Sequence, residues 1–316
     1  MKIFGPIPSR RLGRSLGVNN IPHKVCSYSC IYCQVGRTSN KEIERREYYD
    51  PDEILQEVAD KLVTVTGINE KVDYISIVPD GEPTLDINLE YLIDLLKIFG
   101  IRVAVFTNGS LLWRTDVRAA LSKADLVSIK IDTVDEDIWH RINRPKSNFK
   151  MNLMLSGVRD FVKGYNGRAI TETMLIMGIN DSKLSIERTA QFISKLKINK
   201  SYLAVPVRPP AESRVKSVST TKMDFALEMF GQYNIDAESL SLDTALDFSH
   251  TGEFEEELLS IISVHPMNRE AIYNLLKKAN LDWTVIRELL NQKKMIEVEY
   301  NGGKYYQRNF RYQYMV

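Results

Sequence analysis

Short apolar runs and longer segments of mixed character follow one another along most of the chain. The apolar runs, which are typical of buried strands, cover residues 74–78, 103–107, 126–131, 170–177 and 202–206. Between them, apolar residues recur every three or four positions over ten residues or more, which predicts amphipathic helices. Strands that alternate with helices of this length indicate a parallel sheet.

The helical pattern has start signals that fix its register. The predicted helices cover residues 50–67, 88–99, 114–123, 150–163 and 185–196. In the first, Asp50 can cap the helix, Pro51 suits its first turn and Glu53 completes a capping box. With a short strand at 15–21 the pattern gives six βα units, fewer than a closed eight-fold barrel needs. We therefore expect an α/β fold, a partial (β/α)6 TIM-like barrel, over residues 1–250.

The pattern changes after about residue 255. Two helical segments are followed by alternating residues around Asn301-Gly302-Gly303, a strong hairpin signal. Two helices and a hairpin predict a small winged-helix-like module over residues 256–316. From Pro266 onward the chain carries nine positive and five negative residues. That excess suits a nucleic-acid contact, with protein docking or covering of the barrel as the alternatives.

Composition narrows the class of protein. The 316 residues are 44% hydrophobic and 26% charged, with a formal net charge of +1. This excludes wholesale disorder and gives no overall field that would attract nucleic acid or a membrane. The start M-K-I-F-G-P-I-P has no apolar signal segment, and no apolar run reaches the roughly 18 residues of a membrane span. We expect a cytoplasmic protein with no membrane partner.

All the cysteines of the chain lie in one window, V-C-S-Y-S-C-I-Y-C. Cys26, Cys30 and Cys33 have the spacing C-x3-C-x2-C. In a reducing compartment such a set indicates metal binding or catalysis, because disulfides rarely persist there. Three thiolates can hold three corners of an iron–sulfur cubane and leave one iron open. A closed zinc site with His23 as the fourth ligand is the alternative.

A second motif, V-P-D-G-E-P-T-L at 78–85, follows one βα unit later. It places Asp80, Gly81 and Glu82 at the carboxyl end of a strand, where they face the same barrel mouth as the cysteine loop. A carboxylate beside a glycine could hold an ammonium group there. Alone, D-G-E-P is only a turn; together with the cysteine spacing it is much more specific.

These motifs resemble the radical S-adenosylmethionine (SAM) superfamily. Its pattern has the same cysteine spacing with an aromatic residue where Tyr32 stands, and later a G-G-E-P motif. Further segments match in order: F-T-N-G (106–109), S-I-K-I-D (128–132), N-R-P-K (143–146), M-G-I-N-D (177–181) and V-P-V-R-P-P-A-E (205–212). The resemblance covers about residues 1–215. The opening G-P-I-P-S-R-R-L-G-R-S-L-G is similar to that of the wyosine-base-synthase-like iron–sulfur oxidoreductases.

The resemblance implies a specific chemistry. Cys26, Cys30 and Cys33 would bind a [4Fe–4S] cluster whose open iron is chelated by SAM. One electron, from a reductant such as flavodoxin or ferredoxin, would cleave SAM to methionine and a 5′-deoxyadenosyl radical. That radical would abstract a hydrogen atom from a substrate. The protein's own task would then be positioning and exclusion of water rather than acid–base catalysis, so no catalytic side chain is assigned.

The resemblance also implies cofactor-binding residues. Gly81 and Glu82 would hold the ammonium of SAM, and Tyr32 would lie near its adenine. Asp80 stands where the family has a glycine, and adds a negative charge beside that ammonium. Asn180 would lie near the adenine or ribose. The candidates for the ribose, the methionine carboxylate or the substrate are Thr107, Asn108, Ser128, Lys130 and Asp132.

Several alternatives stay open on sequence alone. The substrate is an RNA base, as in tRNA, or a peptide or protein; an activase that forms a glycyl radical on a partner enzyme is a third case. From a different class, the chain is a metal-stabilised winged-helix binding or regulatory protein with a zinc or redox-sensing cysteine site. Arg10, Arg11 and Arg14 either grip a phosphate or carboxylate or form salt bridges within their loop.

Overall fold

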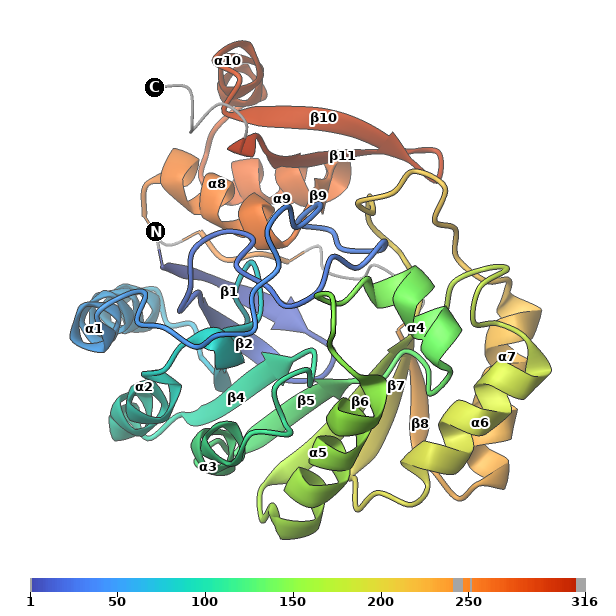
Figure 1. Ribbon diagram of the computed structural model, residues 1–316. Helices are drawn as coiled ribbons and strands as arrows, with labels where there is room; N and C mark the ends of the chain where they lie inside the picture. Colours follow the sequence, from blue (N-terminus) through green and yellow to red (C-terminus); the bar gives the residue numbers. More distant parts are fainter. Residues whose placement is uncertain (1, 241–246, 251, 311–316) are drawn as a thin grey trace.

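One curled sheet forms the body of the molecule. The computed structural model describes residues 2–240, 247–250 and 252–310. Eight strands lie in sequence order; β1 and β2 pair antiparallel, and every pair from β2 to β8 is parallel. The strands are β1 (Ile3–Ser9), β2 (Gly13–Val18), β3 (Tyr74–Ile77), β4 (Arg102–Thr107), β5 (Leu126–Lys130), β6 (Arg168–Met174), β7 (Lys200–Ala204) and β8 (Ala237–Leu240). Figure 1 shows the sheet curved into an open half-barrel, which confirms the expected partial TIM barrel.

Helices follow six of the parallel strands; all but α4 (Glu136–Asn143) cover the convex face of the sheet, and α4 lies at the mouth beside the cysteine loop (Figure 1). They are α1 (Pro51–Gly67), α2 (Leu89–Leu96), α3 (Thr115–Ser122), α4 (Glu136–Asn143), α5 (Met151–Gly164), α6 (Lys183–Ile193) and α7 (Thr220–Gln232), with short 3-10 turns at η1 (Pro83–Leu85) and η2 (Lys97–Phe99). In α1 the Asp50 carboxylate accepts a hydrogen bond from the Asp52 backbone N–H, so it caps the helix as predicted.

Four elements of the half-barrel escaped the sequence pattern: β1, β8, α4 and α7. Pro6 and Pro8 interrupt the apolar run of β1, but it is an edge strand, where a missing backbone N–H costs little. β8 is short and only partly buried, so it has no apolar run. Strands at the rim of a sheet therefore carry the weakest periodic signal.

The two faces of the sheet differ in chemistry. The convex face packs against the helices in the largest apolar cluster of the structure. The concave face is apolar at its floor, where Leu12, Tyr74 and Leu126 belong to a separate small cluster. Because side chains alternate along a strand, Leu126, Ser128 and Lys130 share the concave face of β5. The concave face thus becomes polar toward the carboxyl ends of the strands, which form the mouth.

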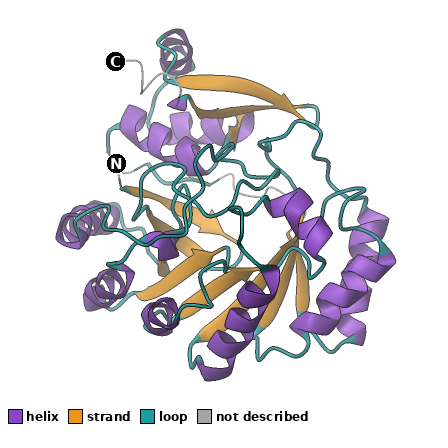
Figure 2. Cartoon of the chain, in the orientation of Figure 1, coloured by secondary structure: helices purple, strands orange, loops and turns teal. Residues whose placement is uncertain are grey.

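The chain from Phe254 to Phe310, here the C-terminal segment, builds its own apolar cluster. It contains α8 (Phe254–Val264), β9 (Met267–Asn268), α9 (Arg269–Lys278), α10 (Thr284–Asn291), β10 (Met295–Tyr300) and β11 (Gly303–Arg308). The strands form a small sheet in the order β10-β11-β9, seen at the top of Figure 2. The two expected helices and the hairpin turn at Asn301-Gly302 are present; α8 and β9 were not anticipated.

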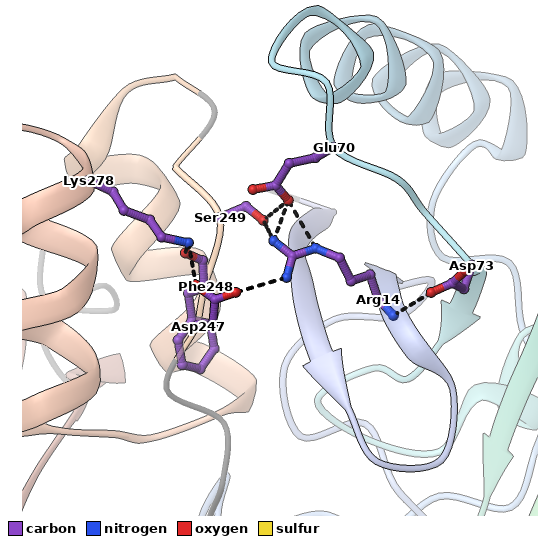
Figure 3. Close-up of polar contacts among 7 residues, drawn as sticks. All are labelled: Arg14, Glu70, Asp73, Asp247, Phe248, Ser249 and Lys278. Carbon is purple, nitrogen blue, oxygen red and sulfur yellow. Dashed lines mark hydrogen bonds and ion pairs between the residues drawn. The ribbon is translucent and has the colours of Figure 1, made fainter.

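A network of charges ties residues 247–249 to the half-barrel, and Figure 3 shows it. Arg14 Nη2 lies 2.5 Å from Glu70 Oε2 and donates to Ser249 Oγ at 2.8 Å, while its Nη1 lies 3.3 Å from Asp247 Oδ2. Lys278 of α9 donates to the other oxygen of Asp247 at 2.6 Å. Arg14 sits at the start of β2, opposite the mouth, so its role is the salt-bridged one rather than capture of a phosphate.

The C-terminal segment also reaches the mouth of the half-barrel. Helix α8 lies against β1, and Ile7 of that strand packs on the segment's apolar cluster. On the opposite side, Tyr300 donates to the Pro206 carbonyl at 2.8 Å and Tyr305 to the Val207 carbonyl at 3.0 Å. The segment thus spans the gap from β1 to the loop after β7. In the part of the chain that the structure describes, no helix is both long and apolar enough to cross a membrane.

We predict that Leu275→Ala destabilises the C-terminal segment by about 2–5 kcal/mol, because Leu275 is 0% exposed and its loss leaves a cavity. Leu281→Ala, at a position that is 41% exposed, is the matched control and should change stability by less than about 0.5 kcal/mol. Urea unfolding curves measure both. Equal effects of the two substitutions would contradict the packing described here.

Candidate functional site

The three cysteines lie in the long loop between β2 and α1, and neighbouring segments fix that loop through its backbone. The Cys26 carbonyl accepts a bond from the Glu42 N–H at 2.9 Å. The Ile31 N–H donates to the Ile142 carbonyl at the end of α4, also at 2.9 Å. These bonds hold the loop over the mouth, at the carboxyl ends of the parallel strands. That is where βα-barrel enzymes place their chemistry.

Each cysteine sulfur receives one N–H group, and the three donors come from different parts of the fold. Asn108 Nδ2, after β4, lies 3.7 Å from Cys26 Sγ. Asn143 Nδ2, the last residue of α4, lies 3.4 Å from Cys30 Sγ. Lys24 Nζ, within the cysteine loop, lies 3.4 Å from Cys33 Sγ. Such donors favour the thiolate form and the sulfur ligands of a cluster.

Sequence reasoning chose Asn108 but not Asn143 or Lys24 as site residues. Asn143 opens the matched segment N-R-P-K, which was the available signal. Lys24 stands two positions before the first cysteine and belongs to no motif that we used. Its role depends on a backbone turn, since Lys24 has a left-handed φ of 61°.

The protonation of the free thiols bears on the redox-sensor alternative. Burial, reinforced by the Glu82 carboxylate, raises the pKa of Cys26 to about 12. Burial and the nearby Asp132 carboxylate also raise the pKa of Cys30. A reactive or redox-sensing cysteine needs a lowered pKa, because the thiolate is the reacting species. These thiols instead suit deprotonation by a bound metal, which releases their protons as it binds.

His23, the fourth ligand in the zinc alternative, is engaged elsewhere. Its Nδ1 lies 3.2 Å from Asp80 Oδ2, and its ring stacks on Phe310 with ring centroids 3.5 Å apart. Among the described residues, no three His, Cys, Asp or Glu side chains are grouped closely enough to hold a single metal ion. A cubane spreads its cysteine ligands more widely than one ion does, so this spacing is compatible with a cluster.

The D-G-E-P loop after β3 lies directly against the cysteine loop. Glu82 N–H donates to the Val25 carbonyl at 3.0 Å, and Lys24 N–H donates to the Asp80 carbonyl at 3.1 Å. A Cβ atom on Gly81 would lie 1.9 Å from the Val25 oxygen. Only glycine permits this approach. The two motifs that carried the resemblance are therefore in contact.

The carboxylate of Glu82 is buried and already accepts several hydrogen bonds. Its Oε1 accepts from the Thr84 N–H, the Thr84 hydroxyl and the Thr107 hydroxyl, the last at 2.6 Å. Its Oε2 accepts from the Asn108 N–H at 2.7 Å. Burial raises the pKa of Glu82, and these donors oppose that shift. Each carboxylate oxygen has two lone pairs, so Oε2, which accepts from one donor, retains capacity for one more.

Asp80, which replaces the family's glycine, points its carboxylate inward and is 4% exposed. Oδ2 faces His23, whereas the buried Oδ1 accepts no hydrogen bond from the described residues. A buried carboxylate oxygen without a donor is costly unless a ligand supplies one. Asp80 is thus available to a cationic group at the junction of the two loops.

Hydrogen bonds of Tyr32, Asp132 and Asn180 connect neighbouring segments at the mouth of the half-barrel. The Tyr32 hydroxyl donates to Asp132 Oδ2 at 2.5 Å, and the same oxygen accepts from Asn143 at 2.7 Å. Asn180 accepts from the Ile176 N–H and donates to the carbonyls of Asp132 and Met174. The hydrogen-bonding groups of Asn180 are therefore used within the protein. Contacts with SAM at this position would therefore be made by the residues around Asn180 and not by its side-chain amide.

A cationic group lies deeper on the concave face. Lys130 Nζ lies 2.7 Å from Glu172 Oε1 and 4.8 Å from the centre of the Tyr32 ring, and Arg11 contacts the other oxygen of Glu172. Burial lowers the pKa of Lys130. Ser128 is buried two residues before Lys130, on the same face of β5. Arg11, unlike Arg14, thus faces the site; Arg10 pairs with Glu238 at 3.2 Å.

The C-terminal segment contacts this region. Gln34, next to Cys33, donates to the Val264 carbonyl at 2.6 Å and accepts from Arg208 at 3.4 Å. Burial and the positive charges of Arg208 and Arg11 hold the pKa of His265 well below its usual range, so that imidazole is neutral. His265 therefore lies close to Arg208 and Arg11.

Comparison with known proteins identifies the family. The Radical SAM superfamily model matches residues 20–193. The UPF0026 protein MJ1312 of Methanocaldococcus jannaschii is 45% identical over 312 residues, which are 98% of this chain and 96% of that protein.

Two solved structures share the fold. A radical SAM methyltransferase from Sphaerobacter thermophilus aligns over 72% of this chain and 66% of its own, with a TM-score of 0.56 and 16% identity. Streptococcus suis SuiB, bound to S-adenosylmethionine, aligns over 71% of this chain and 49% of its own, with a TM-score of 0.53 and 14% identity. The chain is therefore an enzyme of the radical SAM superfamily, whose members use a [4Fe–4S] cluster and SAM, and it belongs to the UPF0026 proteins within it.

Proposed function

We propose that Cys26, Cys30 and Cys33 hold the [4Fe–4S] cluster and that the D-G-E-P loop holds SAM beside it. The observation that carries this proposal is the contact of the two loops, which Gly81 alone permits. The three sulfurs, each with an N–H donor, fit a cluster with one iron left open. When bound, the cofactors would supply reductive cleavage of SAM to methionine and a 5′-deoxyadenosyl radical, which would abstract a hydrogen atom from the substrate.

The protein's part is to bind and orient SAM. The unpartnered Oδ1 of Asp80 and the spare capacity of Glu82 Oε2 lie at the loop junction and suit the ammonium group. Tyr32 and Asn180 would border the adenine and ribose, and Thr107 and Asn108 would orient them from the end of β4. Ser128, Lys130 and Asp132 line the concave face where a substrate would meet the radical. A low-potential one-electron donor, such as flavodoxin or ferredoxin, completes the requirement.

Anaerobic reconstitution of the full chain with iron and sulfide should give a protein that releases 5′-deoxyadenosine from SAM in the presence of dithionite. Cys30→Ala should abolish both the cluster absorbance and the product, because three ligands are needed to keep the cluster. Liquid chromatography of the products measures the outcome. A fully reconstituted wild-type cluster that never cleaves SAM would refute the proposal.

Gly81→Ala should separate the two loops, because its Cβ would overlap the Val25 carbonyl. We expect a stability loss of about 1–3 kcal/mol from the forced shift and a cluster that is released faster in the presence of a chelator. Gly67→Ala, at the end of α1 with no atom within 4 Å of the added carbon, is the matched control. Identical cluster retention in both variants would show that the loop contact is dispensable.

For the substrate we propose an RNA base, with the C-terminal segment as the RNA contact. In this proposal the chain has two domains: the half-barrel comprises residues 1–250, and the C-terminal segment belongs to a winged-helix-like module that comprises residues 256–316. On the module, Arg269 lies over the rings of Tyr273 and Trp283, whose planes are tilted by 30° with centroids 4.5 Å apart, and Tyr273 is 47% exposed. Cation and exposed ring together suit base stacking. The wyosine-base-synthase-like opening supports the same substrate. The competing alternatives are modification of a peptide or protein and formation of a glycyl radical on a partner enzyme.

A gel shift with bulk tRNA should show binding whose affinity falls steeply between about 50 and 200 mM salt, as expected when lysines and arginines displace phosphate counterions. Tyr273→Ala should weaken binding by about 1–3 kcal/mol if a base stacks there. Tyr91→Ala, an equally exposed tyrosine on α2, is the control. Absence of binding even at low salt would favour a protein substrate.

A further inference from the structure

We infer that Lys24 sets the reduction potential of the cluster, by placing a positive charge against the Cys33 sulfur. This inference rests on the proposed cluster site, and it assigns a function to a residue that no motif contains. Lys24 Nζ lies 3.4 Å from Cys33 Sγ. The other two sulfurs receive their N–H groups from the neutral amides of Asn108 and Asn143. Among these three donors, only Lys24 is charged.

Lys24 is held in place from both ends. Its backbone N–H donates to the Asp80 carbonyl at 3.1 Å, and its left-handed φ of 61° turns the side chain back over the loop. The ammonium donates to the Gly36 carbonyl at 2.7 Å, and the Gly36 N–H donates to the Cys33 carbonyl at 3.2 Å. These bonds fix the ammonium group of Lys24 beside the Cys33 sulfur.

The electrostatic consequence has a definite sign. Addition of one electron to a [4Fe–4S] cluster held by three thiolates makes an anionic site more negative. A fixed ammonium stabilises the reduced form more than the oxidised form, because its attraction grows with the charge on the cluster. Hydrogen bonds to cluster sulfurs act in the same direction and are known determinants of potential. Lys24 thus makes the cluster easier to reduce by the one-electron donor that the reaction requires.

The test compares midpoint potentials of full-length, anaerobically reconstituted proteins by EPR-monitored redox titration without SAM. Lys24→Gln, which removes the charge but retains a donor, should lower the equilibrium constant for reduction about tenfold, equivalent to about 59 mV for one electron. Lys24→Arg, which keeps the charge, should stay near wild type. Lys71→Gln, at an 86% exposed lysine before β3 and away from the mouth, is the matched control and should not shift.

The outcomes separate this inference from the proposed function. A wild-type protein that binds no cluster refutes the proposed function itself. A full cluster in all variants with equal potentials overturns the role of Lys24 and leaves the function intact. If Lys24→Gln folds, as judged by circular dichroism, yet cannot retain the cluster while Lys24→Arg can, the lysine serves assembly, and the inference is again overturned. A lower potential in Lys24→Gln alone supports it.

Discussion

The close approach of two backbone segments, at Gly81 and Val25, is the constraint on which the site depends. A side chain at position 81 would occupy the space of the Val25 oxygen. This contact joins the end of β3 to the cysteine loop, and hydrogen bonds from Glu82 and Lys24 lock it from both sides. Through Glu82 the lock extends to Thr107 and Asn108 at the end of β4. The parallel sheet therefore determines the position of the cysteine loop, through the ends of β3 and β4.

Much of the fold followed from periodicity because the helices and parallel strands each bury one continuous face. The strands β3 to β7, with the helices α2, α3, α5 and α6 between them, appear as apolar runs and apolar stripes. The elements that escaped, β1 and β8 above all, lie at the rim of the sheet, where neighbouring contacts are fewer and proline is tolerated. The antiparallel pairing of β1 with β2 depends on tertiary contacts, which the local sequence pattern does not show.

The residues of the candidate site likewise fall into those that the sequence predicted and those that it did not. The cysteines and the D-G-E-P loop were found because their chemistry is concentrated in short motifs. Asn143 and Lys24 were not, because each acts through a backbone position: the end of α4 and a left-handed turn. Tyr32 was chosen from its place in the cysteine motif and Asp132 from its place at a strand end, and the structure places both in one hydrogen-bond network. Lys24 belongs to no motif, and the matched segment N-R-P-K does not show that Asn143 contacts Cys30, so the folded arrangement reveals both contacts.

The span of the C-terminal segment from β1 to the loop after β7 has a consequence for biosynthesis. The cysteine loop is synthesised early, but Gln34 beside it bonds to the carbonyl of Val264. Tyr300 and Tyr305, which bond to the loop after β7, leave the ribosome later still. The contacts between this segment and the cysteine loop consequently form only after the half-barrel has been translated. Under the proposed function, iron and sulfide can reach the loop in the interval before the last helices and the hairpin dock.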